Sequence, residues 1–285
     1  MKKYLFLLLL LFIPVYFTSI KRTKGFSYKK IHSRYAYDSR WDFGPPNEKQ
    51  RALLEKITKE PFTLLGSGKE CYAFMSADGE TVIKFFKQKH MKTRYLLNYL
   101  PLSKEIKMVR SEMLNRHRAF RNKLYQSYQI AYQKLPEETG VLYLHLTKTK
   151  HLKLPIRLEY GNGKRVTLKL DDMEFLVQKR ATPILDYLRA HPKKGKEAIN
   201  AILTLLHTRR GKGVGDNDID CRKNLGFLDD RAIQIDIGEF FPALPALPNK
   251  EDLRLATLDL RAFLEETSPS LVTYLDDQIT LLSKR

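Results

Sequence analysis

Cysteine is scarce in this chain: its 285 residues include only Cys71 and Cys221, and no Cys-x-x-Cys pair occurs. This excludes a disulfide-stapled secreted scaffold and a zinc finger, because both need more cysteines at closer spacing. Acidic residues are also in deficit, with 32 Asp and Glu against 51 Lys and Arg. Hydrophobic residues still make up 43% of the chain, which is enough for a folded core and excludes wholesale disorder.

The excess of positive charge belongs to the first half of the chain. Residues 1–150 hold 29 basic and 12 acidic side chains, whereas residues 151–285 hold 22 and 20. Between Lys84 and Lys123 there are 12 Lys or Arg and two Glu. A basic surface of this kind attracts anionic partners. We expect anionic lipid headgroups; a solvated helix face is the alternative, and nucleic acid comes last.

Residues 4–20 form an uncharged, mostly apolar run. As a helix it would span roughly 26 Å at ~1.5 Å per residue, close to the thickness of a bilayer core. Five basic residues follow within 21–30 and only two precede, which favours a single-pass membrane anchor with the bulk of the chain in the cytoplasm. A cleaved signal peptide and export are the alternative, although the large residues before Thr18 make a poor cleavage site.

Strands and helices are segregated along the rest of the chain. Strand patterns occupy 72–77, 81–86, 141–146, 156–160, 165–170, 174–180, 225–228 and 232–237, and helical patterns occupy 47–59, 103–133, 182–190, 195–209, 250–266 and 269–283. Asp78-Gly79 predicts a hairpin turn between the first two strands. In the helix at 103–133 the apolar stripe comprises Ile106, Val109, Met113, Phe120, Leu124, Tyr128 and Ala131. Segregation of this kind is typical of the α+β class and not of a doubly wound sheet.

Two glycines follow the apolar pair Leu64-Leu65, in a turn between two β-rich runs. A loop that cradles phosphate needs glycine, because backbone N–H groups must approach the phosphate oxygens closely. Lys84 lies in the next strand, where an ammonium group could reach the same oxygens. An ordinary hairpin turn at Gly66 and Gly68 is the alternative.

An acidic loop and a strand-ending aspartate follow later in the chain. Residues 213–224 place three aspartates before Asn224, and carboxylate and amide oxygens in one loop suit a hard cation such as Mg²⁺. A carboxylate there could also accept a hydroxyl proton. Asp236 ends an apolar strand and precedes Gly238 by two residues. A capped or merely soluble acidic turn is the alternative.

The order of these signals resembles that of the protein kinase-like superfamily. The resemblance implies a two-lobed fold and binding of ATP and Mg²⁺. Residues 66–68, with Gly66, Ser67 and Gly68, would cover the phosphates and Lys84 would hold them. Asn224 and Asp236 would hold the metal, and a loop aspartate would orient the hydroxyl of an acceptor that the sequence does not identify.

The chain also departs from the family pattern. Cys71 stands at the third glycine, and Asp216-Asn217-Asp218 replaces the His-Arg-Asp triplet. Asp218 matches the catalytic aspartate best, with Asp220 and Asp216 as alternatives. Glu112, or else Glu105, would be the helix glutamate that pairs with Lys84.

Only 47 residues follow Gly238, so the second lobe would be small, as in compact bacterial lipopolysaccharide-core and metabolite kinases. The expected ranges are a membrane anchor (1–24), a linker with a short helix (25–60), the first lobe with the long basic helix (61–180) and a reduced second lobe (181–285). A membrane-anchored phosphotransferase is therefore expected. The alternatives are a pseudokinase or nucleotide-binding scaffold, and a basic membrane-tethered module that binds anionic lipid or nucleic acid.

A second Asp-x-Gly triplet, Asp42-Phe43-Gly44, spells the metal-binding triplet of that family. It precedes the glycine turn and leads into Pro45-Pro46, so a simple turn is expected there.

Overall fold

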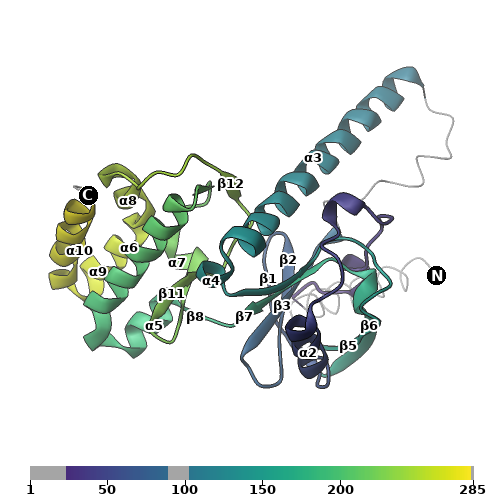
Figure 1. The fold of residues 1–285 in the computed structure, drawn as a ribbon, viewed down its shortest axis with the longest axis horizontal. Helices are drawn as coiled ribbons and strands as arrows, with labels where there is room; N and C mark the ends of the chain where they lie inside the picture. The colour runs from purple at the N-terminus through teal and green to yellow at the C-terminus, as the bar shows by residue number, and fades with distance from the viewer. Residues whose placement is uncertain (1–23, 89–102, 284–285) are drawn as a thin grey trace, which may run out of the picture. The chain divides into compact units, whose positions relative to one another are not determined.

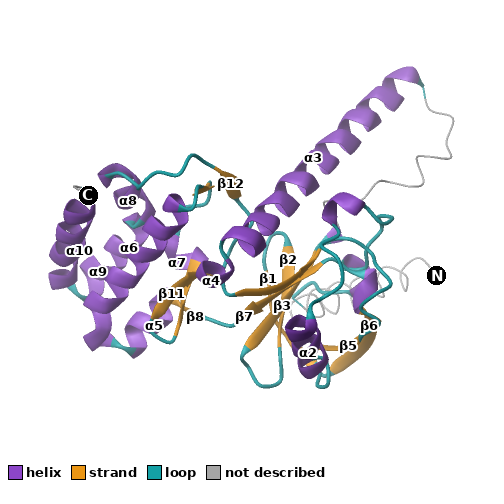
Figure 2. Cartoon of the chain, viewed as in Figure 1, coloured by secondary structure: helices purple, strands orange, loops and turns teal. Residues whose placement is uncertain are grey.

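The computed structural model describes residues 24–88 and 103–283. It is a mixed α+β structure, as the sequence predicts (Figures 1 and 2). The chain divides into two compact units that exchange segments. The first unit comprises residues up to Arg121 together with His145–Val177, and the second comprises Asn122–Leu144 together with Gln178–Arg285.

The first unit is built on a twisted sheet. Its elements are α2 (Glu48–Ile57), β1 (Phe62–Ser67), β2 (Cys71–Met75), β3 (Thr81–Phe86), β5 (Pro155–Tyr160), β6 (Lys164–Lys169) and the first part of β7 (Phe175–Lys179). Neighbouring strands run in the order β7-β3-β2-β1-β5-β6. β4 (Val141–His145) belongs almost entirely to the second unit. The unit boundaries fall at the end of β4 and within β7.

The hairpin between β2 and β3 forms where Asp78-Gly79 predicts it. Gly79 takes a positive φ of 74°, and the Asp78 carboxylate accepts hydrogen bonds from the Ser76 hydroxyl and the Glu80 N–H. These contacts close the turn and set the register, with Lys84 opposite Ala73.

Aromatic side chains fill the core of the first unit. Phe62, Phe74 and Phe85 are fully buried on the strands. Phe26, from the segment before α2, is also buried and makes edge contacts with Phe74 and with two tyrosines, Tyr72 and Tyr160. The segment before α2 therefore packs directly on the strands around the glycine turn.

The second unit is mainly helical (Figure 2). Its elements are α4 (Pro136–Thr139), β8 (Thr182–Pro183), α5 (Ile184–Ala190), α6 (Gly195–Gly211), β9 (Val214–Asp216), α7 (Cys221–Asn224), β10 (Leu225–Leu228), β11 (Arg231–Gln234), β12 (Phe240–Pro242), α8 (Lys250–Ala256), α9 (Leu258–Thr267) and α10 (Pro269–Leu282). Its core joins α6 to α9 and α10 and to the strands β10 and β11. The single helix predicted over 250–266 is wrong, because Thr257 leaves helical geometry and separates α8 from α9.

The long helix α3 (Lys104–Lys134) has the predicted length, but only part of its apolar stripe is buried. Within the first unit Ile106, Val109 and Met113 are 47–58% exposed. Within the second unit Leu124 and Ala131 are buried, together with Tyr128. The apolar stripe is therefore buried in the second half of the helix and exposed in the first half.

No helix in residues 24–88 and 103–283 is long and apolar enough to cross a membrane. The anchor expected at residues 4–20 lies outside the described residues.

Candidate phosphoryl-transfer site

The acidic loop and the Asp-x-Gly segment come together through a pair of very short strands in the second unit. β9 pairs antiparallel with β12, with Asp216 opposite Phe240. Next to this pair, the Asn217 N–H donates to the Glu239 carbonyl at 3.1 Å. Residues 217–224 therefore lie beside residues 236–239.

Asn224 connects the two segments. Its side-chain Nδ2 donates to the Asp218 carbonyl at 3.0 Å. Its own carbonyl accepts from the N–H of Ile235 at 2.7 Å and of Asp236 at 3.3 Å. Asn224 is buried, with 3% of its surface exposed, so these bonds hold it in a fixed position. The structure thus brings Asp218, Asn224 and Asp236 into one hydrogen-bonded network.

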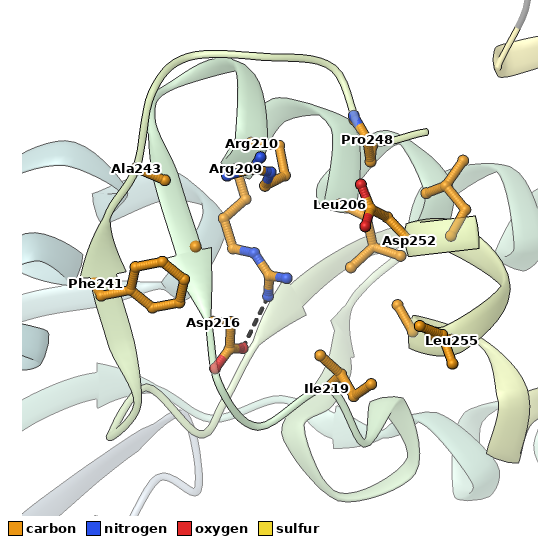
Figure 3. Close-up of a pocket in the computed structure, with 13 residues that line it drawn as sticks. Leu206, Arg209, Arg210, Asp216, Ile219, Phe241, Ala243, Pro248, Asp252 and Leu255 are labelled. Atoms are coloured by element: carbon orange, nitrogen blue, oxygen red, sulfur yellow. Dashed lines mark hydrogen bonds and ion pairs between the residues drawn. The ribbon is translucent and has the colours of Figure 1, made fainter. Parts of the chain in front are cut away.

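The other two loop aspartates already have structural partners. The Asp216 side chain is buried, and its carboxylate lies 3.0 Å from the Arg209 guanidinium; Figure 3 draws this ion pair. Burial raises the pKa of the Asp216 carboxyl, although Arg209 acts in the opposite direction. Because its carboxylate is buried and paired with Arg209, Asp216 has a structural role in the loop.

Asp220 caps the short helix α7. Its carboxylate accepts from the Arg222 N–H at 3.0 Å and lies 2.9 Å from the Lys223 ammonium. Partial burial acts to raise the pKa of Asp220, but Lys223 and Arg222 outweigh it and the pKa is lowered. Asp218, by contrast, is exposed, and its carboxylate accepts only a long bond of 3.4 Å from the Asp220 N–H among the contacts of the described chain. Asp218 is therefore the loop carboxylate best placed to meet a ligand.

The residues present fit a magnesium ion bound through substrate phosphates. Within the part of the chain that is described, no group of three or more His, Cys, Asp or Glu side chains could hold a metal on its own. Asp236 is exposed, and its backbone N–H bonds to the Asn224 carbonyl at 3.3 Å, so the two residues that would offer a carboxylate and an amide oxygen are held by neighbouring backbone. Mg²⁺ is commonly bound by one or two carboxylates, with water and phosphate oxygens completing its shell.

The glycine turn lies in the first unit, at the end of β1. Gly66 belongs to the strand itself, at a bulge in its pairing with β2, and so differs from the loop position expected. A Cβ atom at Gly66 would meet nothing within 4 Å, and one at Gly68 would meet only the Cys71 carbonyl oxygen at 3.9 Å. Neither glycine is required by packing against the described chain, so the space beside both is open to a ligand.

Lys87 contacts the glycine turn, and the sequence analysis did not single it out. Its Nζ donates to the Ser67 hydroxyl at 2.8 Å and to the Gly68 carbonyl, and it lies 4.4 Å from the centre of the Tyr72 ring. These contacts fix the glycine turn from one side. Its position immediately after β3, three residues beyond Lys84, could have indicated from the sequence that Lys87 lies near the glycine turn.

Lys84 and Glu112 also belong to the first unit. Lys84 is half-buried on β3, beside β2. Glu112 is exposed and forms an ion pair with Arg116, one turn further along α3. The pairing of Glu112 with Lys84 stays a prediction. Asp42-Phe43-Gly44 forms the expected turn, in which the Gly44 N–H donates to the Asp42 carboxylate at 2.9 Å.

No protein-family profile and no curated protein matches the sequence. Similar solved structures include Rv3197 of Mycobacterium tuberculosis in complex with erythromycin (14% identity, 82% of this chain, 60% of that chain, TM-score 0.33). Others are WbdD (15%, 74% and 43%, TM-score 0.35) and the streptomycin–ATP–APH(2")-IIa ternary complex (11%, 83% and 87%, TM-score 0.35). One WbdD structure is described as a bifunctional kinase-methyltransferase.

Kinase-like proteins are thus among the structural neighbours, in agreement with the resemblance stated from the motifs. The chain spans about 60% of the Rv3197 chain and 43% of the WbdD chain. Because the TM-scores are low, the function has to be argued from the geometry of the site.

Proposed function

We propose that this chain is a phosphotransferase that moves the γ-phosphoryl group of Mg·ATP to a hydroxyl group of an acceptor still to be identified. The observation that carries the proposal is the network of Asp218, Asn224 and Asp236 in the second unit. Phosphoryl transfer asks mainly for positioned charge and little covalent chemistry. This network holds two exposed aspartates, Asp218 and Asp236, through backbone bonds to the buried Asn224.

Each residue then has a stated task. Asp236 and Asn224 would hold Mg²⁺, which would neutralise charge on the phosphates when bound. Asp218 accepts the proton of the acceptor hydroxyl. In the first unit, the backbone at Gly66 and Gly68 approaches the phosphates and Lys84 pairs with them.

A thermal-shift titration of Mg·ATP, followed by an ATP-consumption assay, tests this proposal. Ligand at 100 times its Kd stabilises a protein by about 2.7 kcal/mol, which is a readily measured rise in Tm. No thermal shift at millimolar Mg·ATP would contradict the proposed nucleotide site.

A nucleotide-binding scaffold is the second candidate. The replacement of the His-Arg-Asp triplet by Asp216-Asn217-Asp218 favours it, because in the family that this chain resembles the triplet carries the catalytic aspartate. A scaffold would bind Mg·ATP without consuming it. Since the acceptor is unidentified, hydrolysis and autophosphorylation are the first activities to measure.

We further propose that residues 4–20 anchor the chain in the cell membrane, with the remainder in the cytoplasm and the first half of α3 against anionic lipid. Exposed Ile106, Val109 and Met113 beside Lys104 and Lys107 support contact with lipid. Impermeant thiol labelling of a cysteine engineered within 26–40 should fail on intact cells. Strong labelling would reverse the topology.

A further inference from the structure

The second unit contains a cavity of about 420 Å³ behind the loop that carries Asp218. Figure 3 shows it between residues of β9 and β12 on one side and of α8 on the other, with the chain from Ala243 to Pro248 arching over it. Its volume lies in the range of ordinary small-molecule sites. None of the roles proposed above for Asp218, Asn224 and Asp236 uses it.

Two glycines set the wall formed by β9 and the arch. A Cβ atom at Gly215 would lie 2.3 Å from the Phe241 ring, so only glycine lets this ring lie flat against β9. Gly213 has a φ of 71°, and a Cβ there would lie 2.9 Å from the Ala243 carbonyl oxygen. The cavity therefore has a defined wall, and the Phe241 ring is part of its lining.

The remaining lining is mainly apolar. Leu206 comes from α6 and Ile219 from the loop, directly after Asp218; Leu255 comes from α8. Ile219 and Leu255 are 44% and 48% exposed, which is unusual for branched apolar side chains that line a concave surface. An apolar ligand would cover both of them.

Of the two arginines that line the cavity, one could pair with a bound anion. Arg209 is committed to Asp216 and to the Gln234 amide oxygen. The Asp252 carboxylate accepts the Asn249 N–H in the capping box of α8. Arg210 is half-buried at the same wall, and within the described part of the chain no carboxylate lies at ion-pair distance from its guanidinium.

We propose that this cavity is a binding site for a small amphipathic acid, whose apolar body packs on Phe241, Ile219 and Leu255 and whose acid group pairs with Arg210. A guanidinium matches a carboxylate, sulfonate or phosphate through two parallel hydrogen bonds. A ligand held there touches Asp216 and Ile219, the residues that flank Asn217 and Asp218. The proposal stands on the cavity alone and does not depend on phosphoryl transfer.

Calorimetric titration of the full chain in phosphatidylcholine nanodiscs tests the site, with empty nanodiscs as the blank. The probes are 2-naphthoate and the uncharged naphthalene-2-carboxamide, which share a shape and differ in charge. Naphthoate should bind at least tenfold more tightly than the amide, the gain expected from a charge-assisted pair.

Three variants separate the acid-binding and apolar parts. Arg210→Gln should weaken naphthoate at least tenfold and leave the amide unchanged. Ala243→Phe, which fills the cavity without altering charge, should weaken both probes. Arg254→Gln, an exposed arginine on α8 that does not line the cavity, is the matched control and should change neither. Unchanged circular dichroism and Tm would show that each variant is folded.

Binding of neither probe, equal affinity for acid and amide, or an equal loss of both probes in Arg210→Gln would overturn the proposal.

Discussion

At the scale of single residues, the three loop aspartates show what sequence reasoning can and cannot separate. Spacing placed Asp216, Asp218 and Asp220 all within reach of a catalytic role. In the structure Asp216 forms a buried ion pair with Arg209, and Asp220 caps helix α7. Arg209 and Gln234 approach Asp216 only because β9 lies beside β11 and α6 in the folded unit. No local pattern could have indicated that.

The first prediction follows from the different contacts of the three aspartates. Asp218→Asn should lower turnover by roughly 10²–10⁴-fold, the usual contribution of a general base, and leave the affinity for Mg·ATP nearly unchanged. Asp220→Asn is the matched control, because asparagine is as good a helix cap as aspartate and should leave turnover close to wild type. ATP consumption and nucleotide titration are measured on both variants. A greater loss in Asp220→Asn would move the catalytic role by two residues.

The second prediction concerns Glu174, a fully buried carboxyl in the first unit. Burial raises its pKa to about 7, although hydrogen bonds from Ser33 and Gln88 act to lower it. An unfolded glutamate titrates near 4.3, so between about pH 4.5 and 7 the folded protein holds the proton that the unfolded chain has released. The free energy of unfolding must then fall as pH rises through this range.

Glu174→Gln removes this titration and keeps a neutral side chain of similar shape. Its Tm should change less than that of the wild type between pH 5 and 8, and the two proteins should differ most at pH 8. Scanning calorimetry across this range is the measurement. If the Tm of the wild type and of Glu174→Gln changed with pH in the same way, Glu174 would be ionised in the folded protein over this range.

At the scale of elements, turn residues and helical periodicity predicted the structure of short segments of the chain. The β2–β3 hairpin, the length of α3 and the start of α6 at Gly195 all follow from turn residues and helical periodicity. The parallel pairing of β1 with β5 joins residues about a hundred positions apart, and no local pattern specifies it. β9 and β12 were missed because three residues carry too little alternation to be recognised.

The third prediction concerns α3, where periodicity correctly gave the helix but not which part of it is buried. The exposed apolar residues of its first half alternate with cations, as in helices that lie in a membrane interface. A protein lacking residues 1–23 should bind vesicles that contain phosphatidylglycerol and not those of phosphatidylcholine alone. Each cation near such a surface contributes about 1 kcal/mol, so Lys104→Gln with Lys107→Gln should weaken binding roughly thirtyfold.

Substitution of two exposed lysines on β6, Lys164→Gln with Lys169→Gln, is the control with the same change in charge and should have a much smaller effect. Binding is measured by vesicle co-sedimentation over a range of salt concentrations. Equal binding to neutral vesicles would show that α3 is an ordinary solvated helix.

At the scale of the whole molecule, the proposed site residues divide between the two units. The glycine turn, Lys84 and Lys87 belong to the first unit, and the network of Asp218, Asn224 and Asp236 belongs to the second. The sequence predicted most of these residues through their order, and the structure explains how each group is held within its own unit. Whether both groups act on one nucleotide is a question about coupling, which a double-mutant cycle measures.

The last prediction is the result of that cycle. Lys84→Met should weaken Mg·ATP binding by removing a cation from the phosphates, and Asp236→Asn should weaken it by removing a charged ligand of the metal. If both residues act on one Mg·ATP, each substitution disturbs the same cluster of charges. The double variant should then lose at least 0.5 kcal/mol less binding free energy than the sum of the single losses, and its remaining binding should depend little on Mg²⁺. Titration of ATP with and without Mg²⁺ on the four proteins gives the coupling energy directly. Losses that add within about 0.3 kcal/mol would show that the two residues are not coupled and would contradict their action on one cluster of charges.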